Sequence, residues 1–321
     1  MSPRAFGSVS SLLFIACALI AACGDVSMTA DGGTPMDASI SGDLSILPDA
    51  SSTDGGERYR TAARLGTVGA GLDEVSGIVA SRTYPGFFWV HNDSGDTPRF
   101  FALDSTAATV ATINVSDATS EDWEDITITE GEGGGDVIYL ANTGDNRARD
   151  TNGADGRAFV ELYRVEEPDP TAGNATVESE RFRFVYPERP YDCEAVFVDH
   201  ASSDVYFVTK EDTPAEVFVA RAPFSSTEMN TLEHAGSVDF SIATAADESR
   251  DGTRIAVRGY ISISVYLRSA GETPIQTLMR NEPLGVAPAS AAEAVCFEPT
   301  GYSLYTIAEG NDSPLYRIPW N

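Results

Sequence analysis

The sequence predicts an all-β fold, a β-propeller of about five four-stranded blades. Short runs rich in β-branched and aromatic residues alternate with turns of Gly, Asp, Pro and Ser, and no long amphipathic helix interrupts them. One short pattern recurs along the chain, as repeat architectures require. An isolated run near the start of this region can supply the strand that the last repeat lacks. A six-bladed ring is the alternative, since residues 141–190 are long enough for an extra hairpin.

Residues 1–22 have the features of a bacterial lipoprotein signal peptide. Arg4 supplies a positive start, and the apolar run Leu12–Ile20 is too short to span a bilayer comfortably. The letters IAAC, ending at Cys23, resemble the lipobox after which a Cys becomes the lipidated first residue. We therefore expect a protein of the cell envelope that reaches the membrane only through lipid on Cys23. An ordinary signal peptide or a small membrane anchor is the alternative.

Residues 23–57 form the second segment, which consists of the lipidated Cys and an acidic linker. Gly24, rather than Asp, follows Cys23, and this favours the outer membrane under the enteric sorting rule. From Gly24 to Glu57 the chain has six Asp, one Glu and no Lys or Arg. Such a segment buries too little apolar surface to offset its ordering entropy, and its charges repel one another. We expect a disordered tether that joins the membrane to a propeller domain of residues 58–321.

Four segments of this domain begin with Glu and an apolar run, and a second β-rich run follows each of them after a turn. The four openings are Glu74–Ile78, Glu124–Ile128, Glu194–Val198 and Glu293–Phe297. The second runs are Phe87–Val90, Val137–Leu140, Val205–Val208 and Leu304–Ile307. A fifth unit lies between the third and the fourth, with Ala243 or Thr244 in place of the Glu and Ile255–Val257 as its second run. We predict that each unit is one blade and that these runs are its first two strands.

Further runs complete the units. The third strand of each unit is marked by an aromatic residue: Phe101, Tyr163, Phe218, Tyr266 and Tyr316. The predicted fourth strands are Val110–Val115, Arg181–Val185, Ser237–Phe240 and Ile275–Leu278. The last unit reaches Asn321 without a fourth strand. We predict that Ala62–Val68 fills this place and closes the ring, which removes exposed sheet edges.

Composition narrows the class of partner. The chain has a formal net charge of −28 and no basic stripe, so its field disfavours nucleic acid and anionic lipid head groups and attracts cations. Cys193 and Cys296 fall on non-neighbouring predicted blades, and we expect two separate buried thiols. We expect a monomer whose partner is a small molecule or an extracytoplasmic protein.

The predicted fold places acidic and amide side chains at one mouth of its channel. Strand one of each blade lines the channel, and its start lies at the same face as the loop after strand two, so the Glu residues that open four blades form a partial ring. As metal ligands we predict Glu74, Asn92, Asp93, Asn142, Asp145, Glu194 and Glu293; as ligand-binding residues we predict His91, Lys210, Arg258 and Glu309. Carboxylate and amide oxygens suit Ca²⁺, which we name as the candidate cofactor. The alternative is structural: the Glu side chains cap backbone amides and hold the blades together.

Two motifs resemble a known family. Glu74–Ile78 (EVSGI) and Asn92–Asp96 (NDSGD) are similar to secreted bacterial propellers labelled SdiA-regulated or phytase-like esterase, over most of residues 65–318. This resemblance implies a propeller and no settled reaction. The Glu, Asn and Asp set also resembles, in residue types alone, the set that gluconolactonase-like propeller hydrolases place around a channel calcium.

The functional interpretation places a membrane-anchored binding propeller first. A calcium-dependent hydrolase is the alternative, and within it we rank a lactonase-like activity above a phytase-like one, because phosphate needs a denser set of cations than this face offers. The sequence contains no G-x-S-x-G or H-E-x-x-H motif and no Gly-rich nucleotide loop, which disfavours a nucleophile-elbow esterase, a zinc protease and a nucleotide-binding enzyme. No catalytic residue is assigned.

Overall fold

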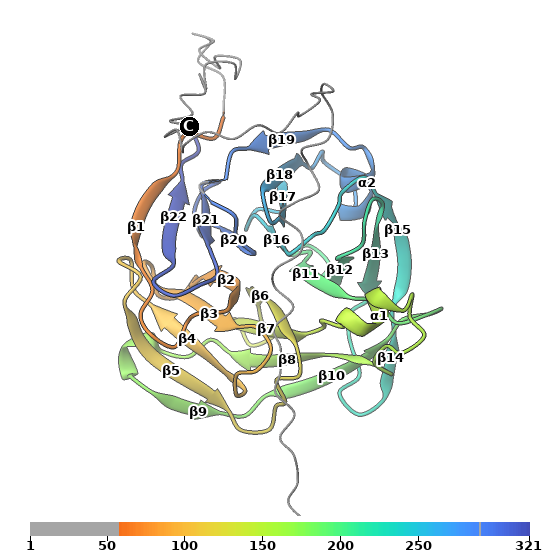
Figure 1. Ribbon diagram of the computed structural model, residues 1–321, viewed down its shortest axis with the longest axis horizontal. Coiled ribbons are helices and arrows are strands. Elements are labelled where there is room, and N and C mark those ends of the chain that lie inside the picture. Colours follow the sequence, from red (N-terminus) through yellow and green to blue (C-terminus); the bar gives the residue numbers. More distant parts are fainter. Residues whose placement is uncertain (1–57, 289) are drawn as a thin grey trace, which may run out of the picture. The chain divides into compact units, whose positions relative to one another are not determined.

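Five antiparallel sheets are arranged around a central axis in the computed structural model, which describes residues 58–321 except residue 289 (Figure 1). The innermost strands β2, β6, β11, β16 and β20 contact one another in this order, and β20 contacts β2. The described residues therefore form a closed five-bladed propeller, and the six-bladed alternative is wrong. The predicted signal peptide, Cys23 and the acidic linker lie outside the described residues.

The blades follow chain order. Blade 1 consists of β2 (Val75–Ala80), β3 (Phe88–Asn92), β4 (Arg99–Leu103) and β5 (Thr109–Val115). Blade 2 consists of β6 (Trp123–Glu130), β7 (Asp136–Asn142), β8 (Val160–Glu166) and β10 (Glu180–Val185). Blade 3 consists of β11 (Cys193–Val198), β12 (Val205–Thr209), β13 (Ala215–Ala220) and β15 (Glu233–Val238). Blade 4 consists of β16 (Ala245–Glu248), β17 (Arg254–Gly259), β18 (Ser262–Leu267) and β19 (Pro283–Val286). Blade 5 consists of β20 (Ala294–Phe297), β21 (Leu304–Ile307) and β22 (Pro314–Ile318), with β1 (Ala63–Thr67) at its outer edge.

The last blade is closed as predicted. Strand β1 pairs antiparallel with β22, from Ala63 opposite Arg317 to Thr67 opposite Pro314. A bridge between Tyr59 and Trp320 extends this pairing, and the two rings meet edge to face with centroids 4.8 Å apart. The two ends of the propeller domain therefore share one sheet, which closes the ring by backbone hydrogen bonds.

One predicted strand is wrong. Residues 275–278 lie in a helix, α2 (Pro274–Met279), and the fourth strand of blade 4 is β19 instead. Thr273 and Gln276 form a capping box, in which the Thr273 hydroxyl accepts from the Gln276 amide and the Gln276 side chain accepts from the Thr273 amide. Pro274 at the first helical position has its φ angle preset for a helix. This local signal outweighs the apolar run that suggested a strand.

Several short elements were not predicted. The connections between the third and fourth strands of blades 2 and 3 contain β9 (Ala175–Val177) and β14 (Met229–Thr231), which pair in parallel with the outer strands of blades 1 and 2. In blade 4 the same connection contains α2, which contacts β15 of blade 3. A helix α1 (Asn146–Asp150) and a 3₁₀ turn η1 (Pro170–Ala172) lie in blade 2. No helix within the described range is long and apolar enough to cross a bilayer.

The hydrophobic core is divided among the interfaces between blades. Five clusters of buried apolar residues in the described part of the chain each join two neighbouring blades. Trp123 is 1% exposed and packs between blades 1 and 2, with Tyr163 at 6.1 Å between ring centroids. Cys193 and Cys296 are buried and unpaired, as expected.

Buried Asp residues connect blades across the channel. The Asp125 carboxylate accepts hydrogen bonds from the amides of Val196 in β11 (2.9 Å) and Ala246 in β16 (3.1 Å). The Asp247 carboxylate accepts from the amide of Phe297 in β20 at 2.8 Å. The blade-joining role considered for the repeat Glu residues is thus filled, at least in part, by neighbouring Asp residues.

Candidate functional site

In each of blades 1 to 3, a β-bulge at the start of the innermost strand determines where the residues near that end of the strand lie. In blade 2, Trp123 faces Asn142 and Asp125 faces Ala141, so Glu124 is the extra, unpaired residue. The same register shift makes Ser76 the extra residue of blade 1 and Glu194 that of blade 3. Glu124 and Glu194 are therefore equivalent positions.

This register corrects the predicted repeat. Glu74, Asp122 and Asp192 are equivalent positions, because each immediately precedes the residue of strand one that pairs with the last residue of strand two. Asp122 and Asp192 lie two residues before Glu124 and Glu194. The repeat predicted from the sequence had treated Glu74 as equivalent to Glu124 and Glu194. Asp122 and Asp192 were missed for this reason, although each lies next to a strand already identified.

Five carboxylates meet at this mouth of the channel in two overlapping groups. The outer group is Asp93, Asp122 and Glu124, and the inner group is Glu124, Asp192 and Glu194. Within each group, one oxygen from each residue lies within 4.8 Å of the others. The inner group is buried, whereas Asp93 and Asp122 are partly exposed, so Glu124 links a buried site to one that is open to solvent.

One oxygen of the inner group has no partner. Asp192 is fully buried; its Oδ1 accepts from the Asp145 amide at 2.7 Å, and its Oδ2 has no hydrogen-bond partner. Glu124 is 2% exposed and accepts only a long hydrogen bond, 3.4 Å, from the Ser76 hydroxyl. Buried polar atoms are almost always satisfied in native proteins, so an unpartnered carboxylate oxygen beside two other carboxylates is unusual.

Lys210 supplies a cationic side chain to the inner group. It follows β12, is 6% exposed, and its Nζ donates to Glu194 in an ion pair. The same ammonium lies 5.1 Å from the centre of the Tyr260 ring of blade 4. The carboxylate of Glu194 and other charges raise the pKa of Lys210 above its ordinary value in spite of burial, which by itself would lower it.

The carboxyl groups hold protons more tightly than usual. Burial, followed by the charges of Asp122 and Glu293, raises the pKa of Asp93 to about 7. Burial and the charge of Asp192 raise the pKa of Asp122 to about 6. Burial also raises the pKa values of Glu124 and Glu194 well above the ordinary range. Near neutral pH the cluster is thus partly protonated, and a bound cation would have to displace these protons.

Gly144, in the loop after β7, leaves room for two of the carboxylates. A Cβ atom at this position would overlap Glu124 Oε1 and lie 2.6 Å from Asp122 Oδ2. The loop backbone therefore approaches the outer group more closely than any other residue type would allow. A cavity of about 270 Å³ adjoins the group and is lined by residues that include Asp122, Gly144 and Arg147.

Blade 5 contributes a pair of carboxyl groups to the same mouth. The Glu309 side chain is hydrogen bonded to Glu293, and burial together with Glu293 raises its pKa to about 9. The Asp93 amide donates to the Glu74 carbonyl at 2.7 Å, and the Gly310 amide donates to the Asp73 carbonyl at 2.8 Å, so the loops that carry Glu74, Asp93 and Glu309 are hydrogen bonded to one another. Glu74 is exposed. The structure therefore brings Glu74, Asp93, Glu194, Glu293, Glu309 and Lys210 to one mouth of the channel.

Three predicted oxygen ligands are engaged in local hydrogen bonds. Asn92 donates to Gly71 O and to Asp96, both at 2.9 Å. Asn142 donates to Glu161 at 2.9 Å and accepts from the amide of Asp122. The third, Asp145, caps α1. Asp145 is not part of either carboxylate group. The Oδ1 atom of Asn92 is buried and has no hydrogen-bond partner.

Two predicted ligand-binding residues are buried in the scaffold. His91 has no exposed surface, its ring lies edge-on to Trp123, and burial lowers its pKa to about 4. Arg258 is also fully buried and donates to the carbonyls of Ala292 (2.9 Å) and Ser290 (3.0 Å), and burial lowers its pKa to about 10. The Arg258 guanidinium therefore connects β17 to the segment before β20, and His91 is not a member of either carboxylate group.

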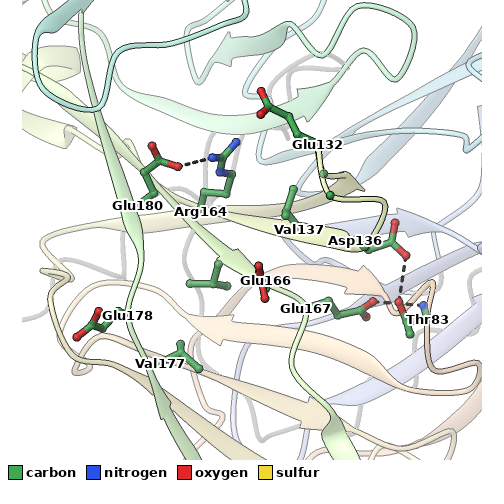
Figure 2. A pocket seen from close by; sticks show the side chains of 14 residues that line it. Thr83, Glu132, Asp136, Val137, Arg164, Glu166, Glu167, Val177, Glu178 and Glu180 are labelled. Atoms are coloured by element: carbon green, nitrogen blue, oxygen red, sulfur yellow. Dashed lines mark hydrogen bonds and ion pairs between the residues drawn. The ribbon is translucent and has the colours of Figure 1, made fainter.

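A larger cavity lies away from this mouth. It has a volume of about 890 Å³ and is lined by the turn after β6, by β8 and by the segment around Glu178 (Figure 2). Two of its acidic side chains have protein partners: Arg164 pairs with Glu180, and Glu167 accepts from the Trp89 indole at 2.9 Å. Figure 2 shows the carboxylates spread along the walls rather than converging on one point. We therefore place the candidate site at the channel mouth.

Fold and site together define a five-bladed β-propeller with a buried acidic cluster at one channel mouth. Neither a protein-family model nor a curated protein sequence matches the chain. Among solved structures, the hydrazine synthase of Kuenenia stuttgartiensis is similar with a TM-score of 0.39 and 10% sequence identity, over 75% of this chain and 70% of that chain. A likeness of this degree carries no argument about activity.

Proposed function

We propose that this protein is a lipid-anchored, extracytoplasmic binding propeller whose channel mouth holds a calcium ion and presents it to a small ligand or a partner protein. One observation carries the proposal: within a buried group of three carboxylates, Asp192 has an oxygen without a hydrogen-bond partner. An isolated buried carboxylate is costly, and a cation removes that cost. Lys210, the only Lys in the chain, pairs directly with Glu194 alone.

The chemistry of the donors favours calcium. All five side chains offer hard oxygen ligands, without the His or Cys ligands that zinc and copper prefer. Calcium takes six to eight oxygens in flexible geometry, and the cavity beside Asp122 leaves space for water or a ligand to complete its shell. The net charge of −28 raises the local concentration of cations.

The envelope location rests on the sequence. The lipobox ending at Cys23 and the acidic segment after it support an anchor and a tether. Metabolic labelling with a palmitate analogue tests this part: the wild-type chain is expected to incorporate label and Cys23→Ala to lose it. Labelled Cys23→Ala, or an unlabelled wild type, would refute the lipid anchor without bearing on the cation site.

Calcium titration tests the cation site. Calorimetry with the purified protein is expected to detect binding, and EDTA is expected to lower the melting temperature, because a ligand that binds only the folded state stabilises it. Asp192→Asn should abolish both effects, because it changes the carboxylate whose oxygen has no partner. Asp239→Asn, on an exposed position remote in sequence from the cluster, is the matched control and should retain them. Absence of binding, together with an unchanged melting temperature in EDTA, would refute the proposal.

A calcium-dependent hydrolase is the second candidate. The observation that favours it is the cavity of about 270 Å³ that adjoins Asp122 and Gly144, because a small substrate there would contact an ion in the outer group. Such an ion can polarise a carbonyl or phosphoryl oxygen. The motif resemblance to phytase-like esterases and the residue types shared with gluconolactonase-like enzymes agree with this class. Calcium-dependent hydrolysis of a sugar lactone or a phosphate monoester, lost in Asp122→Asn, would establish it; calcium binding without turnover leaves the binding function.

A further inference from the structure

The opposite mouth of the channel has a cavity of its own. Each innermost strand runs from the mouth with the carboxylate groups to this one, so the turns that follow β2, β6, β11 and β16 lie here. Three of these turns carry basic side chains: Arg82 follows β2, His200 follows β11 and Arg250 follows β16. All three line one cavity of about 380 Å³. This volume is near the lower end for ligand pockets and suits a small molecule.

Arg82 has a guanidinium without a carboxylate partner. Within the part of the chain that the structure describes, its side chain forms no ion pair, and its hydrogen bond joins Nη2 to His200 Nε2 at 2.6 Å. The carboxylates of Asp199 and Glu248 lie next to His200, but both pair with Arg268, at 2.9 and 2.7 Å. Arg82 is only partly exposed, and charges that are withdrawn from water are normally paired. An unpaired guanidinium facing a cavity therefore indicates a binding position for an anionic group.

His200 holds Arg82 in place without neutralising it. A guanidinium can only donate, so Nε2 of His200 accepts and the ring proton lies on Nδ1, which is 3.3 Å from the Thr129 hydroxyl. Burial, together with the positive charge of Arg82, lowers the pKa of His200 to about 3, so the ring is neutral at physiological pH. The charge of Arg82 is thus retained, and its other N–H groups have no acceptor among the described residues.

The same cavity has an acidic side. Glu130, Glu132 and Asp136, at the turn between β6 and β7, also line it. Glu130 and Glu132 are exposed, and their carboxylates have no partner in the described structure, whereas Asp136 accepts from the Thr83 hydroxyl at 3.2 Å (Figure 2). Two guanidinium groups thus face three carboxylates, so the lining as a whole repels a simple anion. A ligand with one negative and one positive group is attracted by both sides.

We propose that this cavity binds a small zwitterionic ligand, an amino acid or a short peptide, with its carboxylate on Arg82 and Arg250 and its ammonium on Glu130 and Glu132. A guanidinium matches a carboxylate with two parallel hydrogen bonds, and an ammonium offers three donors to carboxylate oxygens. The contact with His200 orders Arg82 before the ligand arrives, which lowers the entropic cost of binding. This site is separate from the proposed calcium site and does not depend on it.

Calorimetric titration of the purified protein tests the proposal, with each of the standard L-amino acids, triglycine, acetate and ethylamine as probes. At least one amino acid or triglycine is expected to bind. Acetate and ethylamine, which carry one charge each, should bind at least about tenfold more weakly, because each forms only half of the charge-assisted contacts. Triglycine separates its two charges further than an amino acid does, so the tighter binder distinguishes the two ligand types. No binding by any amino acid or by triglycine, or acetate binding as tightly as the best of them, would overturn the proposal.

Variants of Arg82 locate the site. Arg82→Met keeps most of the side-chain length and removes the charge, and it should weaken binding of the best probe at least about tenfold, the loss typical of a hydrogen bond to a charged group. Arg183→Met is the matched control and should retain full affinity, because Arg183 also has no ion pair in the described structure but lies on β10, outside the cavity lining. Unchanged affinity in folded Arg82→Met would contradict the proposal.

Exposed positions keep the proposal falsifiable if Arg82→Met fails to fold. Glu132→Gln should weaken binding of the best probe about threefold and leave acetate binding unchanged, since exposed charges contribute less than buried ones. Arg250→Gln should weaken both. Unchanged affinity for the best probe in both variants would refute the assigned contacts. Asp192→Asn, at the other mouth, should leave this binding intact, so the calcium site and the zwitterion site are tested independently.

Discussion

Asp125→Ala tests whether buried hydrogen bonds across the channel hold the blades together. Asp125 has no exposed surface, and its Oδ2 accepts from two amides of other blades, Val196 N at 2.9 Å and Ala246 N at 3.1 Å. Its Oδ1 accepts from the neighbouring Ile126 amide at 2.9 Å. Alanine removes both oxygens and leaves the two inter-blade amides without these acceptors in the interior.

The expected loss follows from these two amides. Each buried donor left unsatisfied costs about 2 kcal/mol, so the free energy of unfolding should fall by about 4 kcal/mol. For a domain of this size, the melting temperature should fall by roughly 10 °C. Urea denaturation and thermal melting, both followed by circular dichroism, measure the two quantities.

Asp125→Asn is the matched variant. Burial raises the pKa of Asp125 well above its ordinary value, although the three amide donors lower it, so the negative charge is costly at this position. Asparagine keeps one carbonyl oxygen and removes that charge, and it should lose less than half as much stability as alanine. A loss below about 1 kcal/mol for Asp125→Ala would refute the argument that this side chain joins the blades, since about 1 kcal/mol is the lower limit of the cost of a single unsatisfied buried amide.

The remaining predictions concern the channel mouth. Because the folded-state pKa values of Asp93 (about 7) and Asp122 (about 6) exceed the ordinary carboxyl value, the stability of the cation-free protein should be highest at acidic pH and should fall as pH rises through 6 to 7. Calcium should therefore raise the melting temperature more at pH 8 than at pH 5, and an equal rise at both would contradict this. Gly144→Ala should weaken calcium binding at least tenfold in calorimetry, because its Cβ would displace the outer carboxylates, whereas Gly133→Ala, with open space around it, should leave affinity unchanged. His91→Gln should change calcium affinity less than twofold, since the ring is buried away from the carboxylate groups; a large loss would make it part of the site.

Periodicity was sufficient to predict most of the propeller. Every first, second and third strand of the five blades contains or overlaps a predicted run, and the N-terminal strand β1 lies where the missing strand was expected. These features could be predicted because they depend on the alternation of apolar runs and turns, which can be seen directly in the local sequence. The helix α2 was missed although its capping box is also local, because the apolar run was given more weight than Thr273 and Gln276.

The sequence predicted an acidic site at the channel mouth, but it identified only some of the residues that meet there. Asp93 and Glu194 do lie in the carboxylate groups, and Lys210 lies beside them. Asp122 and Asp192 were not among the predicted ligands, because a bulge adds one residue to the start of a strand without any change in composition. Their role as metal ligands remains a prediction that the calcium experiments test.

The sequence by itself determined the class of fold, the closure of the ring and the acidic character of one channel mouth, because these depend on period, order and composition. Only the tertiary structure decided which carboxylates meet. That choice depends on strand register and on the convergence of blades 1, 2 and 3, which bring Asp93, Glu124 and Glu194 together from positions up to a hundred residues apart. It also depends on burial, which leaves an oxygen of Asp192 without a partner and places Lys210 beside Glu194.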